Sequence, residues 1–221
     1  MTITERLMGL DPHLILHEES EWSGNGANYK AFNNAGLECE VGEFIYSLVR
    51  LLKPTYVLET GTHEGVGACY IGLALKDNGF GHLDTLEYIP ELHERAAHRI
   101  DKTGVTYFVV PCLLSSLEFC CQHNYQMILL DTEPQIRFQE LVRFYPYLDE
   151  GGYIFIHDLP RSLCQGNVNA DHPEMKSWPF GDLPEEIKEW VRTDKLRVFH
   201  LPSPRGLVGF YKPYATDYHW S

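Results

Sequence analysis

The sequence predicts an α/β fold, in which a doubly wound, mostly parallel sheet is covered by helices on both faces. Apolar strand patterns and helical patterns alternate from residue 55 onward, as they do in parallel sheets. A glycine-rich turn joins the first of these strands to a helix, and acidic residues stand at several predicted strand ends. Open parallel sheets bind their ligands at that edge. The pattern therefore predicts both the fold and the edge that carries the site.

The N-terminal part precedes the alternating pattern and is expected to be a lead-in or cap over residues 1–39. Its segment 22–28 is rich in residues that form turns. A helical pattern over residues 40–52 follows, and Pro54 ends it. We expect this part to belong to a single domain that spans residues 1–221, because the chain is long enough for one sizeable core.

The alternating part contains five strands with helical segments between them. Each strand is a short apolar run, and each helix has apolar residues at helical spacing. In chain order, we expect a strand over 55–59, a helix over 65–76, a strand over 82–87, a helix over 90–101, a strand over 105–110, a short helix over 113–122, a strand over 126–131, a helix over 135–148 and a strand over 153–158.

The C-terminal part begins with an irregular segment over residues 159–184. A helix over 185–193 follows, and then strands over 196–200 and 206–211. The turn formers between these two strands predict a hairpin, so one strand of the pair runs against the other.

Composition and charge exclude several classes of protein. The formal net charge of −13 at pH 7 argues against nucleic-acid binding, since phosphate contacts require clustered Lys and Arg. No apolar run approaches the length of a membrane span, and the N-terminus lacks the apolar core of a signal peptide. Six cysteines without metal-type pairing fit a reduced compartment. We expect a cytoplasmic protein that acts on a small molecule.

The most informative motif is the glycine turn after the first strand. The sequence reads Glu59, Gly61 and Gly65 in the spacing Glu-x-Gly-x-x-x-Gly, and the glycines allow a ligand to approach the backbone closely. A dinucleotide fold has glycine in place of the acid. The motif resembles that of the class I S-adenosylmethionine-dependent methyltransferases, whose Rossmann-like sheet ends with a reversed strand. The resemblance covers most of the chain and implies S-adenosylmethionine as cofactor, bound by the turn residues, including Thr62 and His63.

The other contacts to the donor are expected at the next two strand ends. Glu87 follows Glu59 by 28 positions, at a strand end where a carboxylate can accept hydrogen bonds from both ribose hydroxyls. Tyr88 is its neighbour. In the resembling family an acidic residue after the third strand often contacts the adenine, but this chain has Ser115 in that region. We therefore expect Ser115 or backbone groups to contact the base.

Two further strand ends carry the acids Asp131 and Asp158. They resemble the ligands of metal-dependent small-molecule O-methyltransferases of the catechol type, which implies a divalent metal such as magnesium. The resemblance departs at Leu159, where that type has asparagine, and at Pro134, where it has lysine. His157 is a candidate third ligand or the general base. Asp131 and His157 are thus the candidate catalytic residues, and Asp131 is also expected to contact the donor.

The expected function is S-adenosylmethionine-dependent methyl transfer to a small-molecule acceptor, with O-methylation assisted by a metal. Substrate choice is assigned to residues 161–182 and 22–29 as a lid over the strand ends. Two alternatives stay open, namely a nicotinamide-dependent oxidoreductase and a non-catalytic protein that binds the donor or a metal. Aromatic residues in segments 137–147 and 214–220 could contribute to a homodimer contact.

Overall fold

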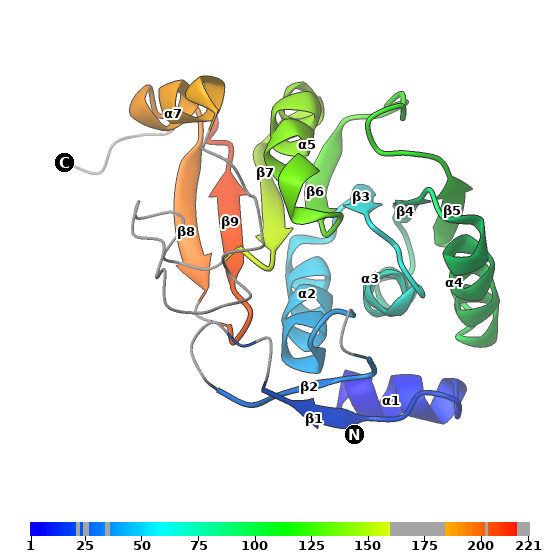
Figure 1. Cartoon of the computed structure of the whole chain (residues 1–221). Coiled ribbons are helices and arrows are strands. Elements are labelled where there is room, and N and C mark those ends of the chain that lie inside the picture. The colour runs from blue at the N-terminus through cyan, green and yellow to red at the C-terminus, as the bar shows by residue number, and fades with distance from the viewer. Residues whose placement is uncertain (21–22, 24–26, 34–35, 160–183, 202, 216–221) are drawn as a thin grey trace.

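A central sheet organises the molecule in the computed structural model, which describes residues 1–221 except 21–22, 24–26, 34–35, 160–183, 202 and 216–221 (Figure 1). The strands of this sheet are Tyr56–Thr60 (β3), His82–Glu87 (β4), Val109–Leu113 (β5), Tyr125–Leu130 (β6), Leu148–His157 (β7), Arg197–Leu201 (β8) and Leu207–Tyr211 (β9). They lie in the order β5-β4-β3-β6-β7-β9-β8. Strands β3 to β7 are parallel to their neighbours, whereas β9 runs antiparallel to β7 and β8. The predicted doubly wound sheet with a reversed last strand is confirmed.

Helices cover both faces of this sheet. Their bounds are Ile3–Leu10 (α1), Cys39–Leu52 (α2), Val66–Asn78 (α3), Pro90–Lys102 (α4), Arg137–Phe144 (α5) and Glu185–Arg192 (α7), with short 3-10 helices at Pro134–Ile136 (η1) and Tyr145–Tyr147 (η2). None of the described helices has the length and apolar content that crossing a bilayer requires.

Two hydrophobic cores result, one on each face of the sheet. Val57 belongs to the core that includes residues of α1, α2, α3 and α4, and its neighbour Leu58 belongs to the core formed with α5 and α7. Successive side chains of a strand point to opposite faces, so one strand contributes to both cores. This explains why the sequence shows continuous apolar runs rather than alternation.

Local sequence features account for the ends of several helices. Helix α1 begins with a capping box in which Thr2 and Glu5 bond to each other's backbone N–H groups. Pro90 occupies the first turn of α4, where a missing N–H costs nothing. Helix α2 ends at Leu52, the following residue Lys53 adopts a left-handed conformation, and Pro54 comes next.

Some predicted elements differ from the observed ones. The strand expected over 105–110 begins only at Val109, because residues 106–108 form a turn and buried Val105 packs beside Gly72 of α3. The helix expected over 113–122 is limited to a turn at Ser115, whose backbone carbonyl accepts from Glu118 and Phe119. The helix expected over 135–148 is divided into η1, α5 and η2.

The sequence analysis did not predict the first helix or a small hairpin. Helix α1 packs against α2 and α3. The hairpin is a two-stranded antiparallel ribbon of His17–Glu19 (β1) and Tyr29–Ala31 (β2), and β2 packs against α2. Most of the proposed lid, residues 161–182, lies outside the described residues, as do parts of segment 22–29.

Candidate functional site

A cavity of about 570 Å³ opens at the carboxyl ends of the parallel strands. Most of the predicted site residues line it, namely Glu59, Gly61, Thr62, His63, Glu87, Tyr88, Ser115, Asp131 and Asp158. Gly65 and His157 do not belong to this lining. Residues from four neighbouring strand ends thus surround one space, as expected for a parallel sheet.

The glycine turn between β3 and α3 requires its two glycines. Gly61 has a φ of 77°, and a side chain there would overlap the backbone carbonyl of Asp131. Gly65 has a φ of 82°, and a Cβ atom would lie 3.0 Å from the Cα atom of Ala96 in α4. Gly65 therefore shapes the turn by close helix packing rather than by lining the cavity.

Glu59 is a buried carboxyl group at the end of β3, only 2% exposed. Its Oε2 atom accepts a hydrogen bond of 2.5 Å from Oγ1 of Thr85, which in turn lies 2.5 Å from Oγ1 of Thr62. Burial raises the pKa of Glu59 to about 8, and the charges of Asp131 and Glu87 add to this rise. A cationic group in the cavity would favour the ionised form of Glu59.

Glu87 is held in place by the backbone at the end of β4. Its Oε2 atom accepts from the backbone N–H of His63 at 2.8 Å, and its Oε1 atom accepts from that of Ile89 at 2.9 Å. Each carboxylate oxygen can accept a further hydrogen bond. The side chain is thus fixed and still able to bind two hydroxyl groups.

Tyr88 and Ser115 also line the cavity. The Tyr88 hydroxyl donates to Oε1 of Glu133 at 2.8 Å, and its ring is half exposed. The Ser115 Oγ atom accepts from the backbone N–H of Leu117 at 3.3 Å, and its hydroxyl proton is therefore available for another partner.

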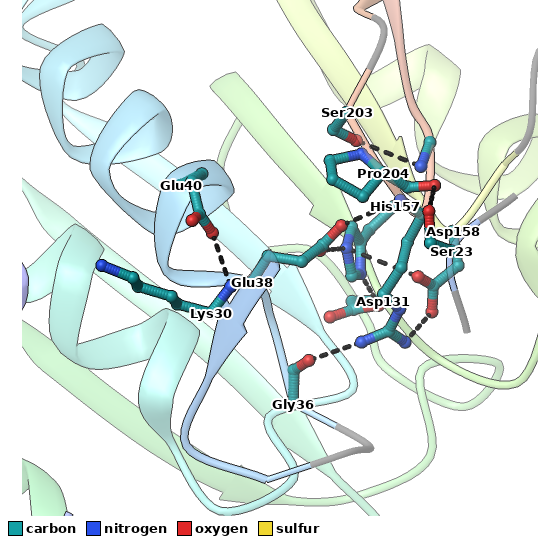
Figure 2. Close-up of polar contacts among 12 residues, drawn as sticks. Ser23, Lys30, Gly36, Glu38, Glu40, Asp131, His157, Asp158, Ser203 and Pro204 are labelled. Carbon is teal, nitrogen blue, oxygen red and sulfur yellow. Dashed lines mark hydrogen bonds and ion pairs between the residues drawn. The ribbon is translucent and has the colours of Figure 1, made fainter. Parts of the chain in front are cut away.

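Behind the cavity, His157 lies at the centre of a buried cluster of carboxylates (Figure 2). Its Nδ1 atom is 2.9 Å from Oδ1 of Asp131, and its Nε2 atom is hydrogen-bonded to Oε2 of Glu38. The Oδ1 atom of Asp158 lies 3.4 Å from the same Nε2. Burial alone would lower the pKa of His157, but the three carboxylates outweigh it and raise the pKa to about 10.

This environment bears on both predicted roles of His157. The ring is fully buried, and both nitrogens face carboxylate oxygens. The raised pKa disfavours the neutral imidazole, which is the form that accepts a proton or binds a metal ion. The ring therefore holds Asp131 and Glu38, and its roles as general base and metal ligand stay predictions.

Two arginines complete the cluster. The Nη2 atom of Arg137 lies 3.3 Å from Oδ1 of Asp131 and 3.7 Å from Oδ2 of Asp158. Arg205, in the turn between β8 and β9, donates from Nη2 to the same Oδ2 of Asp158 at 2.6 Å. Both guanidinium groups are almost fully buried.

The predicted metal site between Asp131 and Asp158 does not fit this arrangement. A divalent cation needs several oxygen ligands around it, but the facing carboxylate oxygens already bind guanidinium groups. The carboxylates of Glu38 and Asp158 also approach His157 closely enough to form a three-residue cluster. Within this cluster the two imidazole nitrogens already face carboxylate oxygens of Asp131 and Glu38.

The sequence analysis missed three residues of the cluster, namely Glu38, Arg137 and Arg205. Glu38 precedes α2, Arg137 begins α5 and Arg205 lies in a hairpin turn. None of them stands at the carboxyl end of a parallel strand, which was the pattern used to find the site. Arg137 follows Asp131 by only six residues, whereas long-range packing brings Glu38 to His157 and Arg205 to Asp158.

Comparison with known sequences agrees with this geometry. Residues 58–159 match the model of a family described as a methyltransferase domain. A protein of Mycobacterium sp. (strain KMS), provisionally named an O-methyltransferase, is 22% identical over 172 residues. The match covers 76% of this chain and 75% of that relative.

Solved structures share the fold over almost the whole chain. The S-adenosylhomocysteine-bound methyltransferase PaMTH1 of Podospora anserina superposes with a TM-score of 0.66 at 14% identity, covering 96% of both chains. The O-methyltransferase TomG of Streptomyces achromogenes, solved with S-adenosylmethionine, has a TM-score of 0.64 at 17% identity. It covers 97% of this chain and 100% of its own. Residues 58–159 thus match a methyltransferase-domain family, and the chain shares the fold of these methyltransferases.

Proposed function

We propose that the protein transfers the methyl group of S-adenosylmethionine to an oxygen atom of a small-molecule acceptor. The observation that carries the proposal is the carboxylate of Glu87, which two backbone N–H groups fix at the cavity with one acceptor position left on each oxygen. This arrangement suits the two hydroxyls of a ribose. The O-methyltransferase names of the mycobacterial relative and of TomG support the choice of oxygen.

The parts of the donor can be assigned to different sides of the cavity. Glu87 binds the ribose, and Tyr88 and Ser115 lie where the adenine would follow it. Asp131 supplies negative charge near the turn, and the carboxyl group of Glu59 would ionise beside the donor's amino group or sulfonium. Thr62 and His63 line the cavity between these two ends.

Methyl transfer requires little covalent help from the protein. The acceptor oxygen forms a bond to the methyl carbon while the carbon–sulfur bond breaks. The electron pair of the broken bond stays on sulfur, which leaves as a neutral thioether. The acceptor hydroxyl also loses its proton. Alignment of the oxygen with the methyl group therefore supplies most of the rate enhancement.

Asp131 is the residue we assign to the acceptor hydroxyl. Its Oδ1 atom is bonded to His157 and Arg137, whereas no hydrogen bond joins Oδ2 to a residue in the described part of the chain. The side chain is 16% exposed and lines the cavity. The Oδ2 atom can therefore accept the hydroxyl proton in a hydrogen bond and direct the oxygen toward the methyl group.

Ligand binding followed by calorimetry tests the donor assignment. S-adenosylhomocysteine is expected to bind wild-type protein with one site per chain, and NADH is expected not to bind. Saturable binding of NADH with no binding of S-adenosylhomocysteine would overturn the proposal.

A further inference from the structure

Arg137 joins the ends of two neighbouring strands through one guanidinium group. Its Nε atom donates to the carbonyl oxygen of Thr132 at 2.7 Å, and its Nη1 atom donates to the carbonyl oxygen of His157. Those residues lie directly beside Asp131 and Asp158, the two acids that Nη2 approaches. The planar donor set of arginine matches several acceptors at once, so the group is held on every side and cannot turn away without losing these bonds.

Arg205, in the turn between β8 and β9, also binds Asp158. Besides its bond to Asp158, its Nη1 atom donates to the carbonyl oxygen of Gly36 at 2.6 Å. Its backbone N–H donates to Oε1 of Glu38 at 3.2 Å. The Oδ2 atom of Asp158 is therefore shared between two guanidinium groups.

Two fixed positive charges already face these acids. The guanidinium of Arg137 approaches Asp131 and Asp158, and that of Arg205 binds Asp158. A divalent ion would add two further positive charges beside them. An ion bound to Oδ1 of Asp131 and Oδ2 of Asp158 would also have to displace Arg137 from both acids, leaving a buried charge without its partners, which is strongly unfavourable.

We propose that the guanidinium of Arg137 takes the place of a divalent cation between Asp131 and Asp158, so that donor binding and methyl transfer in this protein do not depend on a metal. The inference rests on the proposed function for its second part. Metal independence also widens the range of acceptors. A metal ion chelates two adjacent oxygens of an acceptor, whereas Asp131 can orient one oxygen alone. A single hydroxyl group is sufficient.

The first test is a titration of the full-length protein with Mn²⁺, followed by the electron paramagnetic resonance signal of the free ion. At physiological ionic strength we expect no saturable site of one ion per chain. Saturable binding of one Mn²⁺ that Asp158→Asn abolishes would overturn the proposal. Wild-type protein alone provides the main result, so the test does not depend on whether a variant folds.

Two variants test whether Arg137 occupies the position of a cation between Asp131 and Asp158. Arg137→Met removes the guanidinium with little change in length and should create a Mn²⁺ site, whereas Arg137→Lys keeps a positive charge and should not. A site in the lysine variant as strong as in the methionine variant would contradict the role of charge. Thermal unfolding controls for the folded state of both proteins.

Donor binding separates this proposal from the proposed function. The rise in unfolding temperature with S-adenosylhomocysteine should be the same in EDTA and in Mg²⁺. A rise that appears only with Mg²⁺ would overturn the metal-independent site. If S-adenosylhomocysteine raises the unfolding temperature in neither buffer, the proposed donor is overturned. If the wild-type protein also binds no Mn²⁺, the assignment of Arg137 is still supported.

Discussion

The hydroxyl of Thr85 on β4 donates a 2.5 Å hydrogen bond to Oε2 of Glu59 on the adjacent strand β3. This bond favours the ionised form of Glu59, yet burial outweighs it and keeps the pKa at about 8. The carboxyl group therefore takes up a proton on folding in neutral solution, because its pKa in the unfolded chain is near 4.5.

The raised pKa of Glu59 predicts a loss of stability at higher pH. The folded state binds more protons than the unfolded state between about pH 4.5 and pH 8, so the free energy of unfolding falls as the pH rises through this window. Glu59→Gln should remove this part of the decline, and the difference between the two proteins should grow by on the order of a few kcal/mol toward alkaline pH. Urea unfolding of both proteins at a series of pH values measures this difference in the free energy of unfolding. Parallel curves for the two proteins would contradict the prediction.

His157 is expected to remain protonated well above neutral pH. Its pKa of about 10 exceeds the value of 6.5 in the unfolded chain, so its contribution to stability is complete below pH 6.5 and is lost as the pH rises through 10. Nitrogen NMR of labelled histidine should show an imidazolium at pH 8 that is missing in His157→Gln. A titration midpoint near 6.5 for this ring would contradict the raised pKa and favour His157 as the general base.

Gly61 and Gly79 offer a matched pair for testing the glycine turn. They have φ angles of 77° and 80°, but a side chain at Gly61 would overlap the Asp131 backbone, whereas nothing lies within 4 Å of one at Gly79. Gly79→Ala should lower the free energy of unfolding by about 1–2 kcal/mol from backbone strain alone. Gly61→Ala should add about 1–3 kcal/mol from overpacking.

The measurement is chemical denaturation of both variants beside the wild type, with S-adenosylhomocysteine binding measured on the folded proteins. Gly79→Ala should bind normally and Gly61→Ala weakly. Equal losses of stability in the two variants would mean that the overlap at Gly61 is relieved by movement of the turn.

Glu87 is expected to contribute strongly to donor affinity. Glu87→Gln replaces one acceptor oxygen by a donor group, and hydrogen bonds to a charged group are worth about 1.5–3 kcal/mol. Affinity for S-adenosylhomocysteine should therefore fall by about 10- to 100-fold. Glu91→Gln, a change of the same kind at an exposed position in the first turn of α4, is the control and should bind like the wild type. Calorimetry that finds equal affinities for the two variants would exclude Glu87 as the ribose ligand.

The sequence predicted the sheet well because each of its strands has a strong local pattern. Apolar runs bounded by turn formers located β3, β4, β6, β7 and the final hairpin. It misplaced the start of β5 because Val105 is buried in a turn beside Gly72 rather than in the sheet. The local sequence pattern around an apolar residue is the same whether the residue is buried in a turn or in a strand.

The site was predictable only where its residues follow parallel strands. Glu59, Glu87, Asp131 and Asp158 stand at such positions, and all four line the cavity. Arg137 could not be found in this way, because a basic residue at the start of a helix is common and only the packed structure aims it at the acids. The metal was expected because Asp131 and Asp158 resemble the ligands of metal-dependent O-methyltransferases, and the local sequence pattern did not reveal their arginine partners.

The position of Arg205 has a consequence for how the protein is made. Asp158, the last of the three clustered acids to be synthesised, precedes it by 47 residues. A growing chain therefore presents the acids and His157 well before Arg205, whose guanidinium binds Asp158, has been joined to it. Because domains begin to fold as they emerge from the ribosome, the cluster cannot take its final form until the β8–β9 hairpin docks, and maturation of the pocket is a late event in biosynthesis.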